Sequence, residues 1–358
     1  MIAEDPILTA ELQRQFPAPE APSPTDSLLD VPASDGYPNP VPISQLGSAD
    51  AVKWVWTGYL ARMHTTLFTG LWKAGKTTLL AWLLKVFATG GNLGGVVQQA
   101  KVLVISEESK ALWSRRREDL GLGDHVHIIA RPFLGRPSAP QWQGFINHLA
   151  RLVRMVGYDV VVFDTLGAFW PVSDENDAAK VQTALMLLNA LTEAGAAVLL
   201  NHHPRKGDGN EGQASRGSGA LPGFVDIILE LRRYEPENRD DRRRALTCYS
   251  RFDESPAEVV LELTEAGYVS CGSKADAKQA DRLGLLEEIL PADGPGLTAD
   301  EVWARWPEGS IPRPAKRTVR YDLQEGAWQA WIPRAGSDCS FTHIAKTESP
   351  AICVTTPS

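Results

Sequence analysis

The sequence predicts an α/β protein with a mostly parallel central sheet. Apolar runs over 102–105, 126–129, 160–163 and 196–200 show little polar alternation, which suits strands buried on both faces. Another strand is expected over 65–69, directly before a glycine-rich turn and a strongly apolar helix over 76–89. A parallel sheet of this kind needs helices on both of its faces.

Helices between the strands are expected over 111–120, 141–155 and 178–194. After Gly219 the pattern changes to shorter strands. They are expected over 226–231, 245–250 and 259–264, where we expect them to extend the same sheet. The first folded domain is therefore assigned to residues 51–272.

A second, smaller domain is predicted over 273–335. Helices are expected over 282–290, 299–306 and 315–325, with a short strand over 328–331. Thr298 is a suitable N-cap for the second helix, because Asp300 and Glu301 follow in its first turn. Three short helices followed by a strand pair are the outline of a winged helix. Residues 336–358 are assigned to a tail.

Composition limits the class of protein. Residues 1–50 contain nine prolines, eight acidic residues and one basic residue, so we predict a disordered segment. The net charge of −8 excludes a globally basic nucleic-acid coat, although local basic patches remain possible. The four cysteines form no CxxC pair. No apolar run is long enough to span a membrane, so a soluble, cytoplasmic protein is expected.

A phosphate-binding motif follows the first predicted strand. The pattern GxxxxGK[ST] is matched by Gly70, Leu71, Trp72, Lys73, Ala74, Gly75, Lys76 and Thr77. Glycine-containing turns let backbone N–H groups converge on phosphate oxygens, and the following helix points its positive end at the anion. Lys76 is expected to bind the β and γ phosphates of ATP, Thr77 to ligate Mg²⁺, and Thr78 to complete the loop. Lys73 either contacts phosphate or is solvated.

Carboxylates end two of the predicted strands. Asp164 follows the 160–163 run, so it is expected to face the loop and hold Mg²⁺, usually through water. Glu107 and Glu108 follow the 102–105 run, where a carboxylate can polarise the water that attacks the γ phosphate. We prefer Glu107 as this base; the alternative is a pair of solvated charges.

Polar residues also end the 196–200 run. His202 is the predicted γ-phosphate sensor, although a lone histidine is usually structural. Metal binding by His202 together with His203 is disfavoured, because adjacent residues of a strand point to opposite faces.

These motifs, in this order, resemble those of the RecA/DnaB-like P-loop ATPases. The closest likeness is to RepA-type hexameric replicative helicases and related phage or plasmid ATPases, and it covers roughly residues 50–265. Glu107, the Asp164-Thr165 pair, the His202-His203 pair and the segments 215–221 and 226–231 carry it. The resemblance implies a RecA-like core, ATP and Mg²⁺ as cofactors, and a homo-oligomer, expected to be a hexamer.

The resemblance also implies contacts with single-stranded DNA. The family has a loop facing a central channel after the sensor strand, where Arg205, Lys206 and Arg216 are expected to contact the DNA backbone; an ordinary surface loop is the alternative. Arg251 occupies the place of an arginine finger that reaches the neighbouring subunit, with a structural salt bridge as the alternative. The cluster 242–244 is interpreted as a solvated face.

Basic residues in the C-terminal domain suggest a second DNA contact. Lys316, Arg317 and Arg320 lie on the third predicted helix, where side chains can reach phosphates and base edges; a protein-docking domain is the alternative. We therefore expect a DNA-dependent ATPase, a ring-forming helicase or translocase serving plasmid, phage or mobile-element replication, with partners such as a primase or initiator. The alternatives are a nucleotide-switched DNA-binding regulator and a RecA-like recombination or repair ATPase.

Overall fold

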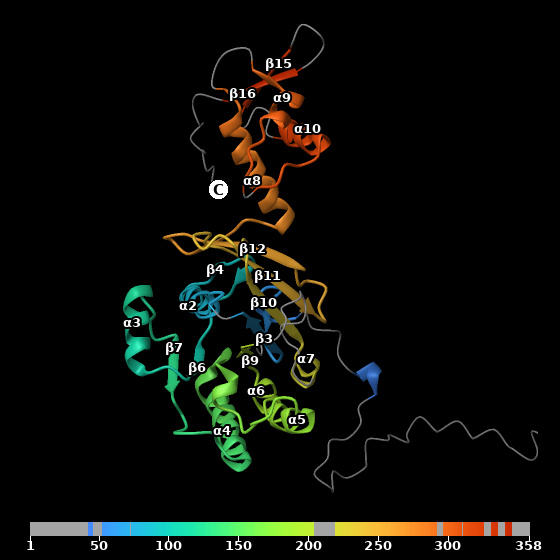
Figure 1. Ribbon diagram of the computed structural model, residues 1–358. Helices are drawn as coiled ribbons and strands as arrows, with labels where there is room; N and C mark the ends of the chain where they lie inside the picture. The colour runs from blue at the N-terminus through green and yellow to red at the C-terminus, as the bar shows by residue number, and fades with distance from the viewer. Residues whose placement is uncertain are drawn as a thin grey trace, which may run out of the picture. The chain divides into compact units, whose positions relative to one another are not determined.

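A nine-stranded sheet forms the centre of the fold in the computed structural model (Figure 1). The chain divides into two units, 1–51 and 52–358, and the sheet lies in the second. Of the segment predicted to be disordered, only residues 42–45, with the turn η1 (Ile43–Gln45), fall within the described part of the chain. The structure describes residues 42–45, 52–71, 73–203, 219–291, 296–309, 311–325, 331–335 and 341–345.

The nine strands run in the order β13-β12-β11-β10-β3-β9-β8-β6-β7. From β10 to β7 all neighbours are parallel, whereas β11, β12 and β13 continue the sheet in antiparallel pairs. The α/β fold with a mostly parallel sheet is thus confirmed. The strands are β3 (Thr65–Gly70), β6 (Val102–Ser106), β7 (Val126–Ala130), β8 (Val160–Asp164), β9 (Ala197–Asn201), β10 (Ile227–Arg233), β11 (Arg243–Ser250), β12 (Glu258–Leu263) and β13 (Tyr268–Ser270).

Helices cover both faces of the sheet, which explains the unalternated apolar runs. Along β6, Val102 and Val104 pack into the core that contains helix α2, whereas Leu103 and Ile105 pack into the core that contains α4. Both sets are buried, so no polar residue is needed at alternate positions. The first face carries α2 (Lys76–Val86) and α3 (Lys110–Leu120), and the second carries α4 (Ala139–Leu152), α5 (Ala178–Met186), α6 (Asn189–Thr192) and α7 (Ala220–Phe224).

Helix ends differ from the predicted ones for local reasons. Helix α4 begins two residues early, because Ser138 and Gln141 form a reciprocal capping box, and it ends in a wider π turn, η2 (Val153–Gly157). The helix predicted over 178–194 is two helices, α5 and α6. The short turn η3 (Leu166–Ala168) follows β8.

Within the described ranges, none of the helices has the length and apolar character needed to span a bilayer.

A small antiparallel sheet was not predicted. Its strands are β1 (Trp54–Trp56), β2 (Leu60–Ala61), β4 (Gly91–Asn92) and β5 (Val96–Val97), in the order β2-β1-β5-β4. Strands of two or three residues are too short to show a hydrophobic period. Trp56 packs into the α2 core, and its indole N–H donates to the Leu93 carbonyl at 2.9 Å.

The described residues of the C-terminal part form three helices and a three-stranded antiparallel sheet in the order β14-β16-β15. The elements are α8 (Lys274–Ile289), β14 (Leu297–Thr298), α9 (Ala299–Ala304), α10 (Lys316–Glu325), β15 (Trp331–Ala335) and β16 (Phe341–Ala345). Helix α8 begins eight residues earlier than predicted, at a capping box formed by Ser273 and Asp276. Strand β16 lies within the segment assigned to a tail. Leu286, Val302, Trp306, Val319 and Leu323 form a core of their own.

Candidate functional site

The carboxyl ends of four parallel strands meet at one edge of the main sheet. In register, Ser106 of β6 lies beside Asp164 of β8, Asp164 beside Asn201 of β9, and Asn201 beside Phe68 of β3. Neighbouring strands are about 4.8 Å apart, so the residues that follow these positions surround a common point. The strand order therefore brings together the acidic, sensing and phosphate-loop segments predicted from the sequence.

The turn between β3 and α2 has the backbone geometry of an anion-binding loop. A Cβ atom at Gly70 would lie 2.4 Å from the Leu231 carbonyl oxygen, so only glycine fits there. Gly75 adopts φ 102° as the N-cap of α2, and no side chain caps this helix end. The first N–H groups of α2 therefore lack a side-chain acceptor and are available to an anion.

The remaining loop positions differ in exposure. Ala74 is buried, Thr77 is half-buried, and Leu71, Lys73 and Thr78 are exposed. Trp72 lies outside the described residues. Lys73 adopts φ 59°, a conformation that is uncommon for a residue with a side chain.

Lys76 is the buried cation of the loop. It is only 4% exposed, and its ammonium group donates to the Gly70 carbonyl at 2.7 Å. Burial lowers the pKa of Lys76 to about 8, and the nearby Asp164 carboxylate opposes this shift. At neutral pH Lys76 therefore remains charged, with donors held at the phosphate loop.

Asp164 is the buried carboxylate opposite the loop. It is 4% exposed, and the Asn201 side-chain amide donates to its Oδ1. Burial raises the pKa of Asp164 to about 6; the hydrogen bond from Asn201 opposes the shift, and Glu108 and Glu107 add to it. Asp164 is thus mostly ionised at pH 7 and loses its charge under mildly acidic conditions.

The two glutamates that follow β6 have different surroundings. Glu108 forms an ion pair with both terminal nitrogens of Arg116, whose guanidinium carbon lies 4.9 Å from the centroid of the Trp113 ring. Glu107 is exposed, and its backbone N–H donates to the Asp164 carbonyl at 3.0 Å. Although the residue as a whole is exposed, protein atoms around its carboxylate exclude part of the water; this desolvation, followed by the Glu108 charge, raises the pKa of Glu107, and a hydrogen bond with Thr165 opposes the shift. Because Arg116 engages Glu108, Glu107 is the better placed of the two to accept a proton.

The two histidines after β9 point in different directions. His203 places Nδ1 3.1 Å from the Lys76 ammonium nitrogen, and burial followed by the Lys76 charge lowers its pKa. His202 instead places Nε2 3.5 Å from a Glu175 carboxylate oxygen and contacts Trp170 edge-on. The structure therefore brings His203 to the loop, whereas His202 was the predicted sensor. The sequence pattern could not assign the direction, although it required that the two residues differ.

Two arginines of the β11 region differ in their position relative to the phosphate loop of their own chain. Ser250 of β11 pairs with Ile227 of β10, which pairs with Thr66 near the start of β3. The phosphate loop follows the other end of β3, so Arg251 lies at the opposite ends of the strands from the loop of its own chain. Its side chain is 63% exposed and lies 3.4 Å from Asp226. Arg244, predicted to be solvated, donates to the Ala74 carbonyl of the loop at 2.7 Å.

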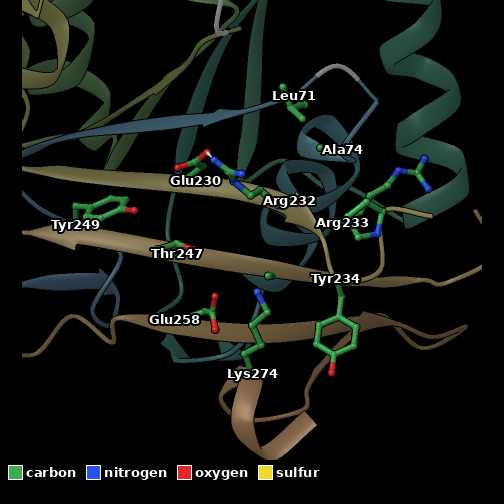
Figure 2. A pocket seen from close by; sticks show the side chains of 12 residues that line it. Leu71, Ala74, Glu230, Arg232, Arg233, Tyr234, Thr247, Tyr249, Glu258 and Lys274 are labelled. Carbon is green, nitrogen blue, oxygen red and sulfur yellow. Dashed lines mark hydrogen bonds and ion pairs between the residues drawn. The ribbon is translucent and has the colours of Figure 1, made fainter. Parts of the chain in front are cut away.

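A groove of about 560 Å³ adjoins the loop on the face of the sheet that carries α8 (Figure 2). Leu71 and Ala74 line it from the loop, and Figure 2 shows Glu230 and Arg232 of β10 paired beside them. Thr247, Tyr249, Glu258 and Lys274 complete much of its lining. This groove could not be predicted from the sequence, because only strand register brings these positions together.

The residues at this edge fit ATP and Mg²⁺. Mg²⁺ prefers hard oxygen ligands and keeps several waters and substrate oxygens, so the Thr77 hydroxyl and the Asp164 carboxylate are a sufficient protein contribution. Within the described part of the chain, three buried atoms at these strand ends have no hydrogen-bond partner: Thr69 Oγ1, Asn201 Oδ1 and His202 Nδ1. Buried polar atoms normally have partners, so this edge has unused capacity for a polar ligand.

Only some of the residues predicted to contact nucleic acid lie within the described part of the chain. Arg205, Lys206 and Arg216 lie outside the described residues. Lys316 and Arg320 of α10 lie 3.2 and 3.5 Å from the same Asp300 oxygen, which reduces the local positive charge. Arg317, on the same helix, is exposed.

Comparison with known proteins links this site to nucleotide-hydrolysing domains. The family described as AAA domain matches residues 39–209, a range that includes the loop and extends past β9. Among solved structures, the chain is similar to a KaiC-like protein from the hyperthermophilic archaeon Pyrococcus horikoshii OT3, with 18% identity, a TM-score of 0.42, and coverage of 61% of this chain and 99% of that one. No curated protein matches the chain. The AAA match and the loop sequence support a P-loop ATPase domain in this part of the chain.

Proposed function

We propose that this chain is an ATP-hydrolysing, DNA-dependent motor: a ring-forming helicase or translocase of RepA type that acts on plasmid, phage or other mobile-element DNA. The observation that carries the ATPase part is the buried Lys76 ammonium group in a glycine-shaped loop, with Asp164 and Glu107 at the same edge of the sheet. The DNA part rests on the resemblance to that helicase family and on the basic residues of α10.

The chemistry follows from the roles of individual side chains. Lys76 exchanges its bond to the Gly70 carbonyl for bonds to phosphate oxygens, while the N–H groups of the loop bind the same anion. Thr77 and Asp164 would hold Mg²⁺, which when bound would supply positive charge to neutralise the phosphates. Glu107 orients the attacking water and accepts its proton, a role that its raised pKa suits.

In this proposal, Arg251 of a neighbouring subunit completes the active site. Within its own chain it lies at the far edge of the sheet from the loop and is largely exposed, so it does not serve the site of its own subunit. An arginine inserted in trans stabilises the charge that develops during phosphoryl transfer. The active form is therefore a homo-oligomer, which the family resemblance makes a hexamer.

The C-terminal helices and strands serve as the DNA-docking part. Their order, with three helices and a three-stranded antiparallel sheet, fits a winged helix whose third helix is α10. Arg317 is exposed on this helix and suits a phosphate contact. We propose that this docking part also binds a replication protein such as a primase or initiator.

One experiment separates the proposed function from its alternatives. The purified chain is sized with and without a non-hydrolysable ATP analogue, and its ATPase activity and strand displacement are then measured with single-stranded and partly duplex DNA. We expect an analogue-dependent ring, DNA-stimulated turnover and strand displacement. Slow turnover with ATP-dependent duplex binding would instead identify a regulator, and filaments with strand exchange would identify a recombination ATPase.

A further inference from the structure

Strand β11 holds the phosphate loop and helix α8 with two consecutive residues. The Nε of Arg244 donates to the Ala74 carbonyl at 2.7 Å. Arg243 forms an ion pair with Asp281 of α8, and its guanidinium carbon lies 4.3 Å from the centroid of the Tyr234 ring. Consecutive strand residues point to opposite faces, so one segment of β11 contacts the loop on one side and α8 on the other.

The Arg244 side chain is held in a defined position. Besides the bond to Ala74, its Nη1 donates to the Asp241 carbonyl at 2.9 Å and to the Arg243 carbonyl at 2.7 Å. A Cβ atom on Gly75 would lie 3.4 Å from Nε, which places the guanidinium directly beside the N-cap of α2. A planar guanidinium group bound to three carbonyls has little rotational freedom, so it fixes what it contacts.

The contact matters because of what the loop must do. A loop that binds phosphate has to direct its N–H groups at the anion and its carbonyl oxygens away from it. Lys76 already bonds to the Gly70 carbonyl, and Arg244 bonds to the Ala74 carbonyl. Lys76 is proposed to leave the Gly70 carbonyl for phosphate, whereas Arg244 is also bound to the Asp241 and Arg243 carbonyls and keeps the Ala74 carbonyl engaged.

We infer that Arg244 is a positioning residue for nucleotide binding, which holds the Ala74 carbonyl away from the phosphates and adds a fixed positive charge beside Gly75. This inference rests on the proposed function, since it requires ATP at the loop. Arg244 does not touch the reacting atoms, so it acts on affinity for the phosphate tail rather than on the chemical step.

The test compares Arg244→Ala, Arg244→Lys and the matched control Arg242→Ala with the wild-type chain. Arg242 is the same residue type two positions earlier and is exposed. Calorimetry with a magnesium-bound, non-hydrolysable ATP analogue is expected to show about tenfold weaker binding for Arg244→Ala, as for loss of a charge-assisted hydrogen bond. Arg244→Lys is expected to recover part of the affinity, and Arg242→Ala to match the wild type.

Steady-state ATPase assays provide the second measurement. KM for ATP is expected to rise with the dissociation constant while kcat changes little. A purely structural role would instead lower kcat through loss of active protein and leave KM unchanged, which would overturn the inference. Should Arg244→Ala not fold, the same comparison is made with Arg244→Gln, and wild-type KM and affinity in that variant would likewise overturn it.

The wild-type titration separates this inference from the proposed function. If the folded wild-type chain does not bind the analogue, the ATPase proposal itself is refuted. If the wild type binds and Arg244→Ala binds equally well, only the role of Arg244 is refuted.

Discussion

Lys76 and Asp164 are charged groups held where burial disfavours their charge. Burial lowers the pKa of Lys76 to about 8 and raises that of Asp164 to about 6, so each shift favours the neutral form. Both groups nevertheless remain mostly charged at pH 7. Such placement is typical of functional sites, where binding of an oppositely charged ligand offsets the unfavourable burial.

Lys76 predicts how nucleotide affinity depends on pH. As the pH rises through about 8, the nucleotide-free protein loses the Lys76 proton, and phosphate binding then requires proton uptake. We expect affinity for the ATP analogue to be flat between about pH 7 and 8 and to fall by at most about tenfold per unit above that range. Calorimetric titrations in buffers from about pH 7 to 9.5 would measure it, with circular dichroism as the folding control.

The stability of the nucleotide-free protein should change in the opposite direction. The pKa of Lys76 is lower in the folded state than its ordinary value of 10.5, so the unfolded state binds more protons between about pH 8 and 10.5. The contribution of Lys76 to the free energy of unfolding therefore rises with pH in that window.

The affinity prediction has its own contrary outcome. Constant affinity for the ATP analogue from about pH 8 to 9.5 would contradict the assigned role of Lys76.

Glu107 and Glu108 make a matched pair of variants. Glu107→Gln is expected to reduce kcat by about 100-fold or more while retaining ATP binding, because it removes the group that accepts the water proton. Glu108→Gln weakens the ion pair with Arg116 and should reduce kcat far less. Single-turnover ATP hydrolysis by the two proteins measures the difference, and equal losses would refute the choice of Glu107.

Sequence patterns located the strand-end residues but not the direction of every side chain. The loop, Asp164 and Glu107 were predictable because a motif and two buried runs define them and parallel strands align their ends. Whether His202 or His203 faces the loop depends on side-chain direction at the strand end, which the pattern leaves open. Arg244 was missed because its contact with Ala74 joins positions 170 residues apart.

Among the elements, predictability followed length and burial. Strands β6, β8 and β9 were predictable as continuous apolar runs, whereas the two- and three-residue strands of the small sheet carry no period. Helix α8 was predicted too short because its first two turns are polar. Those turns are nevertheless anchored, since Ala277 packs against Tyr234 and Val260, and Asp281 accepts a hydrogen bond from Tyr234.

An ion pair between α8 and α10 gives a prediction for the C-terminal helices. Asp322 is completely buried and accepts two hydrogen bonds from Arg282. Asp322→Ala would leave a partly buried guanidinium without its partner, so we expect a loss of about 3–5 kcal/mol in the free energy of unfolding of this part.

Lys316→Ala is the control for that variant. It removes an exposed ion pair with Asp300 and should cost less than about 1 kcal/mol. Urea unfolding followed by tryptophan fluorescence can measure both variants, since Trp306 lies in the same core. Similar losses in the two proteins would show that the α8–α10 ion pair does not stabilise the helices as described.

At the scale of the whole molecule, the phosphate loop and Arg251 of one subunit lie at opposite ends of the strands of the sheet. In the proposed oligomer, each complete active site therefore needs the loop of one subunit and Arg251 of its neighbour. Lys76→Met removes nucleotide binding and leaves Arg251 intact, whereas Arg251→Ala does the reverse.

Mixing these two inactive proteins tests the arrangement directly. Interfaces that combine an intact loop from one variant with an intact arginine from the other are expected to recover ATPase activity, up to about a quarter of the wild-type rate if subunits mix randomly in a ring. ATPase activity across a series of mixing ratios measures this. Activity that never exceeds the sum of the two separate proteins would contradict a role in trans, provided that light scattering confirms mixed oligomers.

Strand β3, which leads into the phosphate loop, has neighbours that are synthesised much later. It spans Thr65–Gly70, but its partners β9 and β10 begin at Ala197 and Ile227. On the ribosome, β3 and its two unsatisfied edges must therefore wait for more than a hundred further residues before either side can pair. Long-range pairing of this kind slows folding and exposes strand edges to aggregation, so premature termination before β9 leaves a nascent chain without a completed nucleotide site.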